Sequence, residues 1–192
     1  MPSFEKQNFN SNNQGSNRQE IGNSVAFNAD GTVMAVGFSE TTLSSPNTVR
    51  GTVRIYNYIG TKWVTGETYT GEYAGDEFGY SVDLNDTGDL CIIGAPNFYN
   101  EIYGYIGKVY VADYTSGSWN SNLSTFIKYD TIGLGTSVSV QGTLSEPYFF
   151  ASEPTATNIG KVIRLKGEEA EEELAVIAEE EVAVIAEEEV AG

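Results

Sequence analysis

The sequence predicts an all-β fold of three successive antiparallel sheets, because one short motif recurs three times and strand-like segments follow each copy. The copies begin 57 and 56 residues apart: Ile21-Gly22-Asn23-Ser24-Val25, Phe78-Gly79-Tyr80-Ser81-Val82 and Leu134-Gly135-Thr136-Ser137-Val138. A fixed period in this range is typical of stacked or radially repeated architectures, in which each copy is one supersecondary unit. The 12 Tyr, 9 Phe and 21 Gly, with 40% hydrophobic residues, are typical of a globular, β-rich chain.

Each of the first two copies continues as two strands joined by a turn. Asp30-Gly31 interrupts the apolar stretch 25–37, and Asp86-Thr87-Gly88 interrupts the stretch 82–96. Glycine adopts a positive φ without steric cost, so Asp and Gly between two apolar runs predict a β-hairpin. The third copy has no Asp-Gly turn.

A third strand is expected to begin at a glycine in every copy. Apolar and other residues alternate there with a period of two, as in a half-buried strand. The three segments are 51–56, 107–111 and 160–165. Trp63 and Trp119 then lead into a fourth candidate strand in the first two copies, at 65–70 and 125–129. Four strands in a repeat of this length predict the blade of a β-propeller.

The sequence therefore predicts a partial β-propeller of about three four-stranded blades. An N-terminal segment (1–20), blade 1 (21–77), blade 2 (78–133), an incomplete blade 3 (134–166) and a tail (167–192) are the expected parts. Propellers typically have four to eight blades, so three interpretations remain open. The chain is an open arc, a fragment of a longer propeller, or half of a six-blade ring formed by a homodimer. Residues 4–10 would then be the outer strand of a preceding or partner blade.

Two motifs of the second copy resemble a known repeat. Phe78-Gly79, followed by Gly94-Ala95-Pro96, is similar to the FG-GAP repeat, the blade unit of integrin-α-like β-propellers. The first copy has Ile21-Gly22 without a later Ala-Pro, and the third has Leu134-Gly135 with Ala151-Ser152-Glu153-Pro154. The resemblance covers residues 21–166 and implies a β-propeller with, most often, a surface or extracellular binding role. The first residues lack the basic and apolar regions of a signal peptide.

The tail is acidic and repetitive. It holds 11 glutamates and no Lys, Arg or Asp, and so most of the net charge of −17. An eight-residue unit occurs twice, at 174–181 and 182–189. Eight residues advance an α-helix about 80° beyond two turns, so the apolar residues do not form one stripe. Ala, Leu and Glu favour a helix, so we expect an exposed helix, with disorder as the alternative. Its role is either an acidic interaction tail or a low-complexity expansion without function.

The residue types disfavour catalysis. The sequence contains no His, which removes the usual general base and the commonest metal ligand. Cys91, the single cysteine, lies in an apolar run and is expected to be a buried free thiol. Asp76, Glu77 and Asp130 precede repeat motifs and would be the carboxylates of a glycoside hydrolase. Solvated loop carboxylates give the same pattern, so we expect a non-enzymatic protein without a cofactor.

The sequence also disfavours a calcium site, nucleic-acid binding and a membrane span. Asp83, Asn85, Asp86 and Asp89 crowd one turn, but the loop is too short to wrap a calcium ion with six to eight oxygens. We interpret these residues as turn formers and expect no metal site. An acidic chain repels phosphate, so nucleic acid is not an expected partner. The sequence contains no run of about 18 apolar residues, so we expect no membrane span.

The best candidate for a binding site is the connection between the second and third strands of blade 2. Corresponding loops of successive blades lie on one face, and long insertions there usually carry recognition. Tyrosine offers a large contact area with a polar tip, which suits protein or glycan ligands. The alternative is that these aromatic residues pack against neighbouring blades and that the chain is a purely structural repeat. The candidate residues are Asn97, Phe98, Tyr99, Asn100, Glu101, Tyr103 and Tyr105.

Overall fold

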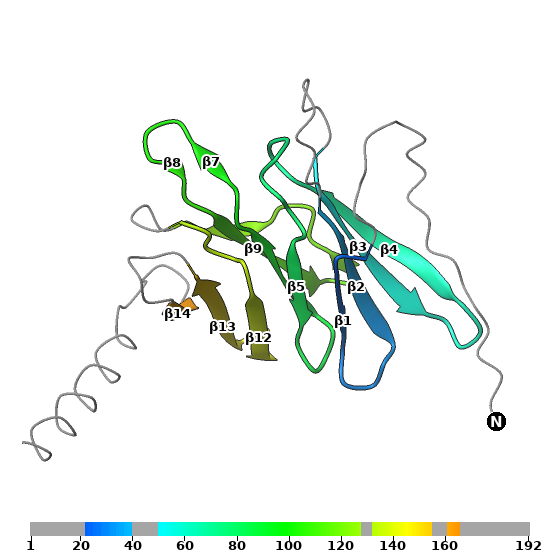
Figure 1. The fold of residues 1–192 in the computed structure, drawn as a ribbon. Coiled ribbons are helices and arrows are strands. Elements are labelled where there is room, and N and C mark those ends of the chain that lie inside the picture. Colours follow the sequence, from blue (N-terminus) through cyan, green and yellow to red (C-terminus); the bar gives the residue numbers. More distant parts are fainter. Residues whose placement is uncertain (1–21, 40–49, 128–131, 155–160, 166–192) are drawn as a thin grey trace, which may run out of the picture.

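The computed structural model describes residues 22–39, 50–127, 132–154 and 161–165. All regular structure in these ranges is β-strand, and three antiparallel sheets follow one another along the chain. The first strands of the sheets, β1 (Ser24–Phe27), β5 (Ser81–Leu84) and β12 (Val138–Thr143), lie side by side (Figure 1). This is the arrangement of three consecutive β-propeller blades, and it confirms the predicted fold class.

Blade 1 is a four-stranded sheet in sequence order. Its strands are β1, β2 (Val33–Phe38), β3 (Thr52–Tyr58) and β4 (Trp63–Thr70). The predicted Asp30-Gly31 turn joins β1 to β2, and Gly31 has a φ of 72°. The Asn28 side chain closes this turn, because its Oδ1 accepts the N–H groups of Thr32 and Val33 at 2.9 Å each.

Blade 2 repeats this order with two differences. Its strands β5, β6 (Leu90–Ala95) and β9 (Lys108–Thr115) pair in sequence order. The fourth strand is divided, because β10 (Ser118–Trp119) pairs with the end of β9 and β11 (Ser124–Phe126) with its first half. A separate hairpin, β7 (Tyr99–Asn100) with β8 (Gly104–Tyr105), lies between β6 and β9. The fourth strand predicted at 125–129 is therefore only one of two short pieces.

Blade 3 has three strands in the described part of the chain. They are β12, β13 (Glu146–Glu153) and β14 (Lys161–Leu165), paired in sequence order. Leu144 and Ser145 form the two-residue connection of the first hairpin, in which Thr143 pairs with Glu146. The segment 1–20, the acidic tail and its predicted helix lie outside the described residues.

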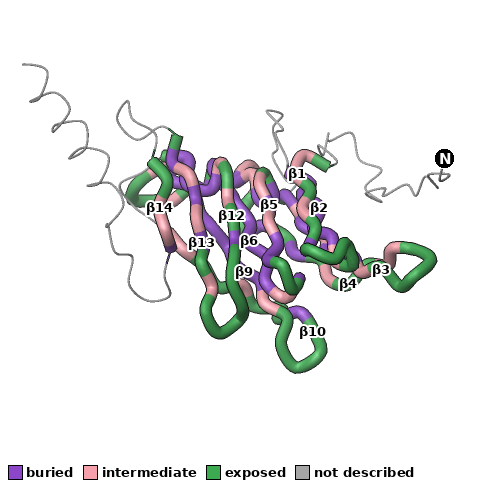
Figure 2. The backbone as a smooth tube through the Cα atoms, turned by 90° about the horizontal axis from the view of Figure 1, so that it is seen from below, coloured by how far each residue is buried: buried purple, intermediate pink, exposed green. Residues whose placement is uncertain are grey.

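The core consists of two layers between blades and a smaller cluster within blade 1, formed by Met34, Val36, Phe38 and Tyr56 with Trp63. Figure 2 shows the buried residues gathered along the middle strands. One face of blade 2, with Val82, Leu84 and Ile93, packs against blade 1 in a shared cluster. The opposite face, with Ile92 and Val111, packs against blade 3. Alternate residues of one strand thus enter different layers, as the strand period of two requires.

The recurrent motif lies where one blade meets the next, and glycines make room for it. Phe78-Gly79 lies against Gly37 and Gly51 of blade 1, where a Cβ added to Gly37 would be 2.0 Å from the Gly79 oxygen. In the next blade, a Cβ added to Gly94 would be 2.0 Å from the Gly135 oxygen, and Gly107 faces the Leu134 backbone. We call each glycine pair, Gly37/Gly51 and Gly94/Gly107, a glycine seat. The same contact occurs twice, so the period of the sequence is also the period of blade packing.

Hydrogen bonds from polar side chains link the first strands of neighbouring blades. The Val82 N–H donates to Ser24 Oγ at 2.8 Å, and Ser81 Oγ donates to the Gly135 carbonyl at 2.7 Å. The Val140 N–H donates to Asp83 Oδ2 at 2.9 Å. These bonds satisfy backbone groups that no sheet pairing reaches.

Cys91 is fully buried in the layer between blades 1 and 2, and burial raises the pKa of its thiol. We expect iodoacetamide, followed by mass spectrometry, to label the native protein at least about 1000-fold more slowly than the urea-unfolded chain. The thiol becomes reactive only when the two blades separate. Stoichiometric labelling of the native protein within minutes would contradict this placement.

Candidate binding surface

The β7–β8 hairpin projects from the end of blade 2 (Figure 1). Tyr99 pairs with Tyr105, and Asn100 pairs with Gly104. The hairpin is outside the three sheets, because β7 and β8 pair only with each other among the described strands. It therefore lies on the side of the arc where β6 ends and β9 begins.

The tip of the hairpin is held by Asn100. Its Oδ1 accepts the N–H of Ile102 at 2.9 Å and the N–H of Tyr103 at 3.2 Å. A side chain that closes its own turn mimics a backbone turn and fixes the residues that follow. Asn100, which the sequence suggested as a contact residue, thus orders the tip.

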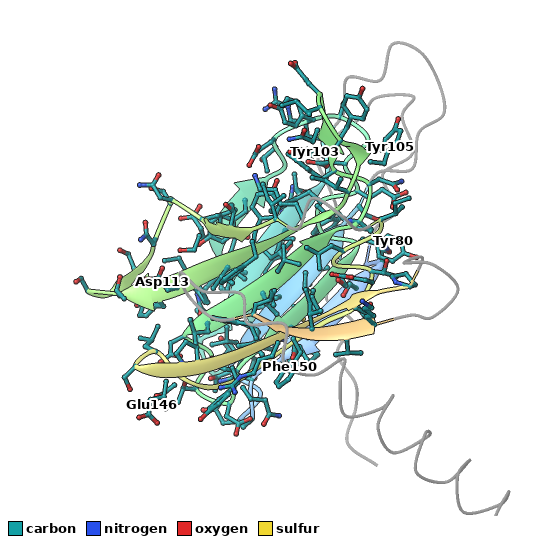
Figure 3. The ribbon with its side chains drawn as sticks, turned by 90° about the vertical axis from the view of Figure 1, so that its left-hand side faces the viewer. Tyr80, Tyr103, Tyr105, Asp113, Glu146 and Phe150 are labelled. Atoms are coloured by element: carbon teal, nitrogen blue, oxygen red, sulfur yellow. The ribbon has the colours of Figure 1, made fainter. Side chains whose placement is uncertain are left out.

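Four large apolar side chains are exposed on this hairpin. The exposed fractions are 50% for Tyr99, 82% for Ile102, 55% for Tyr103 and 60% for Tyr105. The Tyr99 and Tyr105 rings meet edge to face, with centroids 5.2 Å apart. Figure 3 shows Tyr103 and Tyr105 together at the end of the hairpin, far from Glu146 of blade 3. We call these four residues the tyrosine platform.

The sequence analysis missed one member of the platform, Ile102. Turn centres are usually polar. An apolar residue at the centre of a turn, between Glu101 and Tyr103, was therefore the signal that could have predicted an exposed contact residue there. Asn97 and Glu101 are exposed beside the platform, as a contact role requires.

Phe98 corrects the list of contact residues. Its exposed fraction is 5%, and its ring packs against Tyr73 with centroids 5.8 Å apart. Its carbonyl accepts the N–H groups of Ile106 at 3.0 Å and Gly107 at 3.3 Å. Phe98 therefore joins the base of the hairpin to blade 2, and its ring is not available to a ligand.

Lys108 also stabilises the base of the β7–β8 hairpin. Its side chain is buried, forms an ion pair with Glu72, and places its ammonium 4.7 Å from the centre of the Phe98 ring. The ammonium is also 4.8 Å from the centre of the Tyr110 ring. A buried ammonium needs such partners, so this cation belongs to the fold of the hairpin base.

Asp76, one of the suggested catalytic carboxylates, holds backbone groups of a buried loop. It is almost fully buried, and its carboxylate accepts the N–H of Phe78 at 3.0 Å and that of Tyr73 at 3.3 Å. Burial raises the pKa of Asp76, and the two hydrogen bonds oppose this shift. Its carbonyl accepts the Asn97 N–H at 3.2 Å, which ties this loop to the hairpin. Asp130, the suggested second carboxylate, lies outside the described residues.

The acidic turn of blade 2 is organised by hydrogen bonds. Asn85 is buried; its Oδ1 accepts the N–H groups of Asp89 and Leu90, and its Nδ2 donates to the Gly142 carbonyl of blade 3 at 3.0 Å. Asp83 accepts hydrogen bonds from blade 3 through Ser139 and Val140. The interpretation of these residues as turn formers is confirmed for Asn85. Within the described ranges, no three His, Cys, Asp or Glu side chains gather as metal ligands.

Comparisons with known proteins give a likeness to solved structures. No family model and no curated protein sequence matches the chain. Among 62 matching solved chains, the structure of the Dos1 propeller has a TM-score of 0.41 and 16% sequence identity. The likeness covers 73% of this chain and 29% of the Dos1 propeller chain, so this chain spans less than a third of that structure. Of the residues described here, none belongs to a helix long and apolar enough to span a membrane.

Proposed function

We propose that this chain is a non-enzymatic binding module that contacts a protein or a glycan through the tyrosine platform. One observation carries the proposal: four large apolar side chains are exposed on a hairpin whose tip and base are both held in place. Exposed apolar residues that gather in this way mark interaction sites more often than isolated ones do. The platform stays outside the clusters of the core, so blade packing does not account for it.

The chemistry of the platform suits recognition with a small entropic cost. Tyrosine has few rotatable bonds, and the tip of the hairpin is fixed before binding by the Asn100 turn. A ring face can stack on a sugar or pack against an apolar side chain, while the phenol oxygen exchanges hydrogen bonds. Placing the chain in the FG-GAP repeat family, with a surface or adhesive role, belongs to the same proposal.

A non-enzymatic role is supported by the position of Asp76. Its two carboxylate oxygens already accept backbone hydrogen bonds in a buried loop. A general acid of a glycosidase must instead reach the scissile bond of a sugar. The loop therefore uses this carboxylate to hold Phe78 and Tyr73 in place.

We expect combined alanine replacement of Tyr99, Tyr103 and Tyr105 to weaken ligand binding at least about tenfold, which corresponds to about 1.4 kcal/mol. Binding is measured on a glycan array and on a panel of immobilised proteins, with the wild-type chain as the reference. The melting temperature should fall by no more than about 3 °C, because the three rings are at least half exposed.

Tyr58→Ala is the matched control, because Tyr58 is also an exposed tyrosine on a hairpin, here between β3 and β4. It should leave binding unchanged. A large loss of melting temperature in the triple variant would instead favour the second candidate, a purely structural repeat in which the rings hold the hairpin. If the wild-type chain bound nothing on the glycan array or on the protein panel, the result would count against a binding module.

A further inference from the structure

The sequence contains two N-glycosylation motifs, and the structure gives them opposite surroundings. The motifs are Asn85-Asp86-Thr87, in the turn between β5 and β6, and Asn122-Leu123-Ser124, between β10 and β11. Motifs of this length arise by chance, so the surroundings of each asparagine decide whether it can carry a glycan. An acceptor asparagine must lie at the surface, because the attached oligosaccharide is bulky and hydrated.

Asn85 is enclosed by the contact between blades 2 and 3. It is 1% exposed, and its Nδ2 donates to the Gly142 carbonyl of blade 3 at 3.0 Å. The same nitrogen donates to Thr87 Oγ1 at 2.9 Å and to Asp89 Oδ1 at 2.7 Å. A sugar on Nδ2 would replace a hydrogen that these bonds use and would stand between the two blades. Native packing therefore excludes a glycan at Asn85.

Asn122 lies in the segment that divides the fourth strand of blade 2. Pairing with β9 stops after the Asn120 N–H bonds to the Asp113 carbonyl, and it resumes where Ser124 meets Val111. Over the matching part of the third strand, blade 1 uses the three residues 64–66 and blade 2 the four residues 120–123. The additional residue takes this segment, and with it the second motif, out of the ladder.

Backbone and core contacts hold the segment around Asn122 in place. Tyr69 Oη donates to the Asn120 carbonyl at 2.9 Å, and the Asn122 backbone N–H donates to Asn120 Oδ1 at 3.0 Å. Leu123 is partly buried and packs against the core cluster shared by blades 1 and 2. Asn122 and Ser124, on either side of Leu123, are exposed. The asparagine and the hydroxyl residue of this motif are therefore both accessible, and the bonds that fix the segment come from other groups.

We propose that Asn122 is the acceptor of an N-linked oligosaccharide and that Asn85 stays unmodified in the folded protein. The inference rests on the surface role proposed above, because this modification takes place in the secretory pathway. Asn122 Nδ2 forms a bond to the anomeric carbon of the donor, a lipid-linked oligosaccharide diphosphate. The bond from that carbon to the phosphate oxygen breaks, the amide gives up one proton, and the lipid diphosphate leaves. No group is oxidised or reduced.

A glycan on Asn122 would leave the tyrosine platform accessible. Strand β9 begins at Lys108, beside the β7–β8 hairpin, and the Asn122 segment bonds to Asp113 near its other end. Figure 3 shows Asp113 well away from Tyr103 and Tyr105. We therefore expect the glycosylated chain and the enzymatically deglycosylated chain to bind platform ligands equally well.

The test expresses the full-length chain behind a cleavable secretion signal in cultured mammalian cells. Folded protein is purified from the medium and from the cell extract, so poor secretion does not hide the result. Peptide N-glycosidase F releases the glycan and converts the acceptor asparagine to aspartate, which mass spectrometry locates. The wild-type chain should carry one oligosaccharide, on Asn122. Asn122→Gln and Ser124→Ala should each lose the whole mass shift, whereas Ser124→Thr, which keeps the motif, should retain it.

The matched control is Thr87→Ala, which destroys the motif of Asn85 in the same way and should leave glycosylation unchanged. A folded wild-type chain without a glycan overturns the inference, and so does a folded chain that carries a glycan on Asn85. If Asn122→Gln does not fold, Ser124→Ala gives the same comparison. An unmodified chain that still binds its glycan or protein ligand leaves the tyrosine platform proposal intact, whereas a chain glycosylated on Asn122 that binds nothing supports only the present inference.

Discussion

Replacing Gly94 with alanine is expected to destabilise the protein by about 3 kcal/mol, toward the upper end of the usual cost of overpacking. The added Cβ would stand 2.0 Å from the Gly135 oxygen, and the obstructing atom is backbone that cannot rotate away. Blade 3 would have to shift as a unit, which would disturb the layer that contains Ile92 and Val140. Thermal unfolding followed by circular dichroism should show a fall of about 6–12 °C. Gly37→Ala should behave alike, because it faces the Gly79 oxygen at the same distance.

Ser152→Ala is the control for this prediction. Position 152 is the equivalent of Gly94 and already carries a Cβ, so the change removes only a hydroxyl that accepts the Ser137 N–H. We expect a cost of at most about 1 kcal/mol. Equal melting temperatures for Gly94→Ala and the wild type would mean that the blades are not packed through the glycine seat.

The repeat made the blades predictable because it is both a local and a long-range signal. Each glycine seat contacts a motif one repeat later in the chain, so the spacing in the sequence is also a distance between packed segments. The hairpin turns were predictable from Asp and Gly alone. Asn85 was interpreted as a turn former, but its counterpart Asn28 was not singled out. How each closes its turn depends on backbone N–H groups four and five residues later.

The candidate site was predictable only as a region. An aromatic loop gives no sign of which ring faces inward, and Phe98 and Tyr99 are neighbours in sequence with opposite burial. The difference comes from the strand period that starts at β7 and from Tyr73 and Lys108, which lie more distant along the chain. The divided fourth strand of blade 2 escaped prediction for a similar reason. The Asn120 N–H still bonds to the Asp113 carbonyl of β9, but pairing resumes only where Ser124 meets Val111, so residues 121–123 interrupt the strand.

Phe78→Ala should have a still larger effect, a loss of about 4 kcal/mol in the free energy of unfolding. Phe78 is fully buried and meets the Tyr110 ring edge to face, with centroids 5.0 Å apart. It also lies against the Gly51 and Gly71 positions of blade 1. Removal of the ring leaves a cavity between two blades, and rigid strands on both sides limit its collapse. Urea unfolding followed by tryptophan fluorescence measures the loss.

The repeat supplies its own control for Phe78, because Leu134 fills the corresponding position between blades 2 and 3. Phe78→Leu keeps most of the apolar volume, so we expect a cost below about 1.5 kcal/mol. Tyr80→Ala, two residues away and more than one third exposed, should cost less than about 1 kcal/mol. If Phe78→Leu were as harmful as Phe78→Ala, the contact with Tyr110 would matter more than the filled volume. The two blade contacts would then differ in chemistry, although they share one geometry.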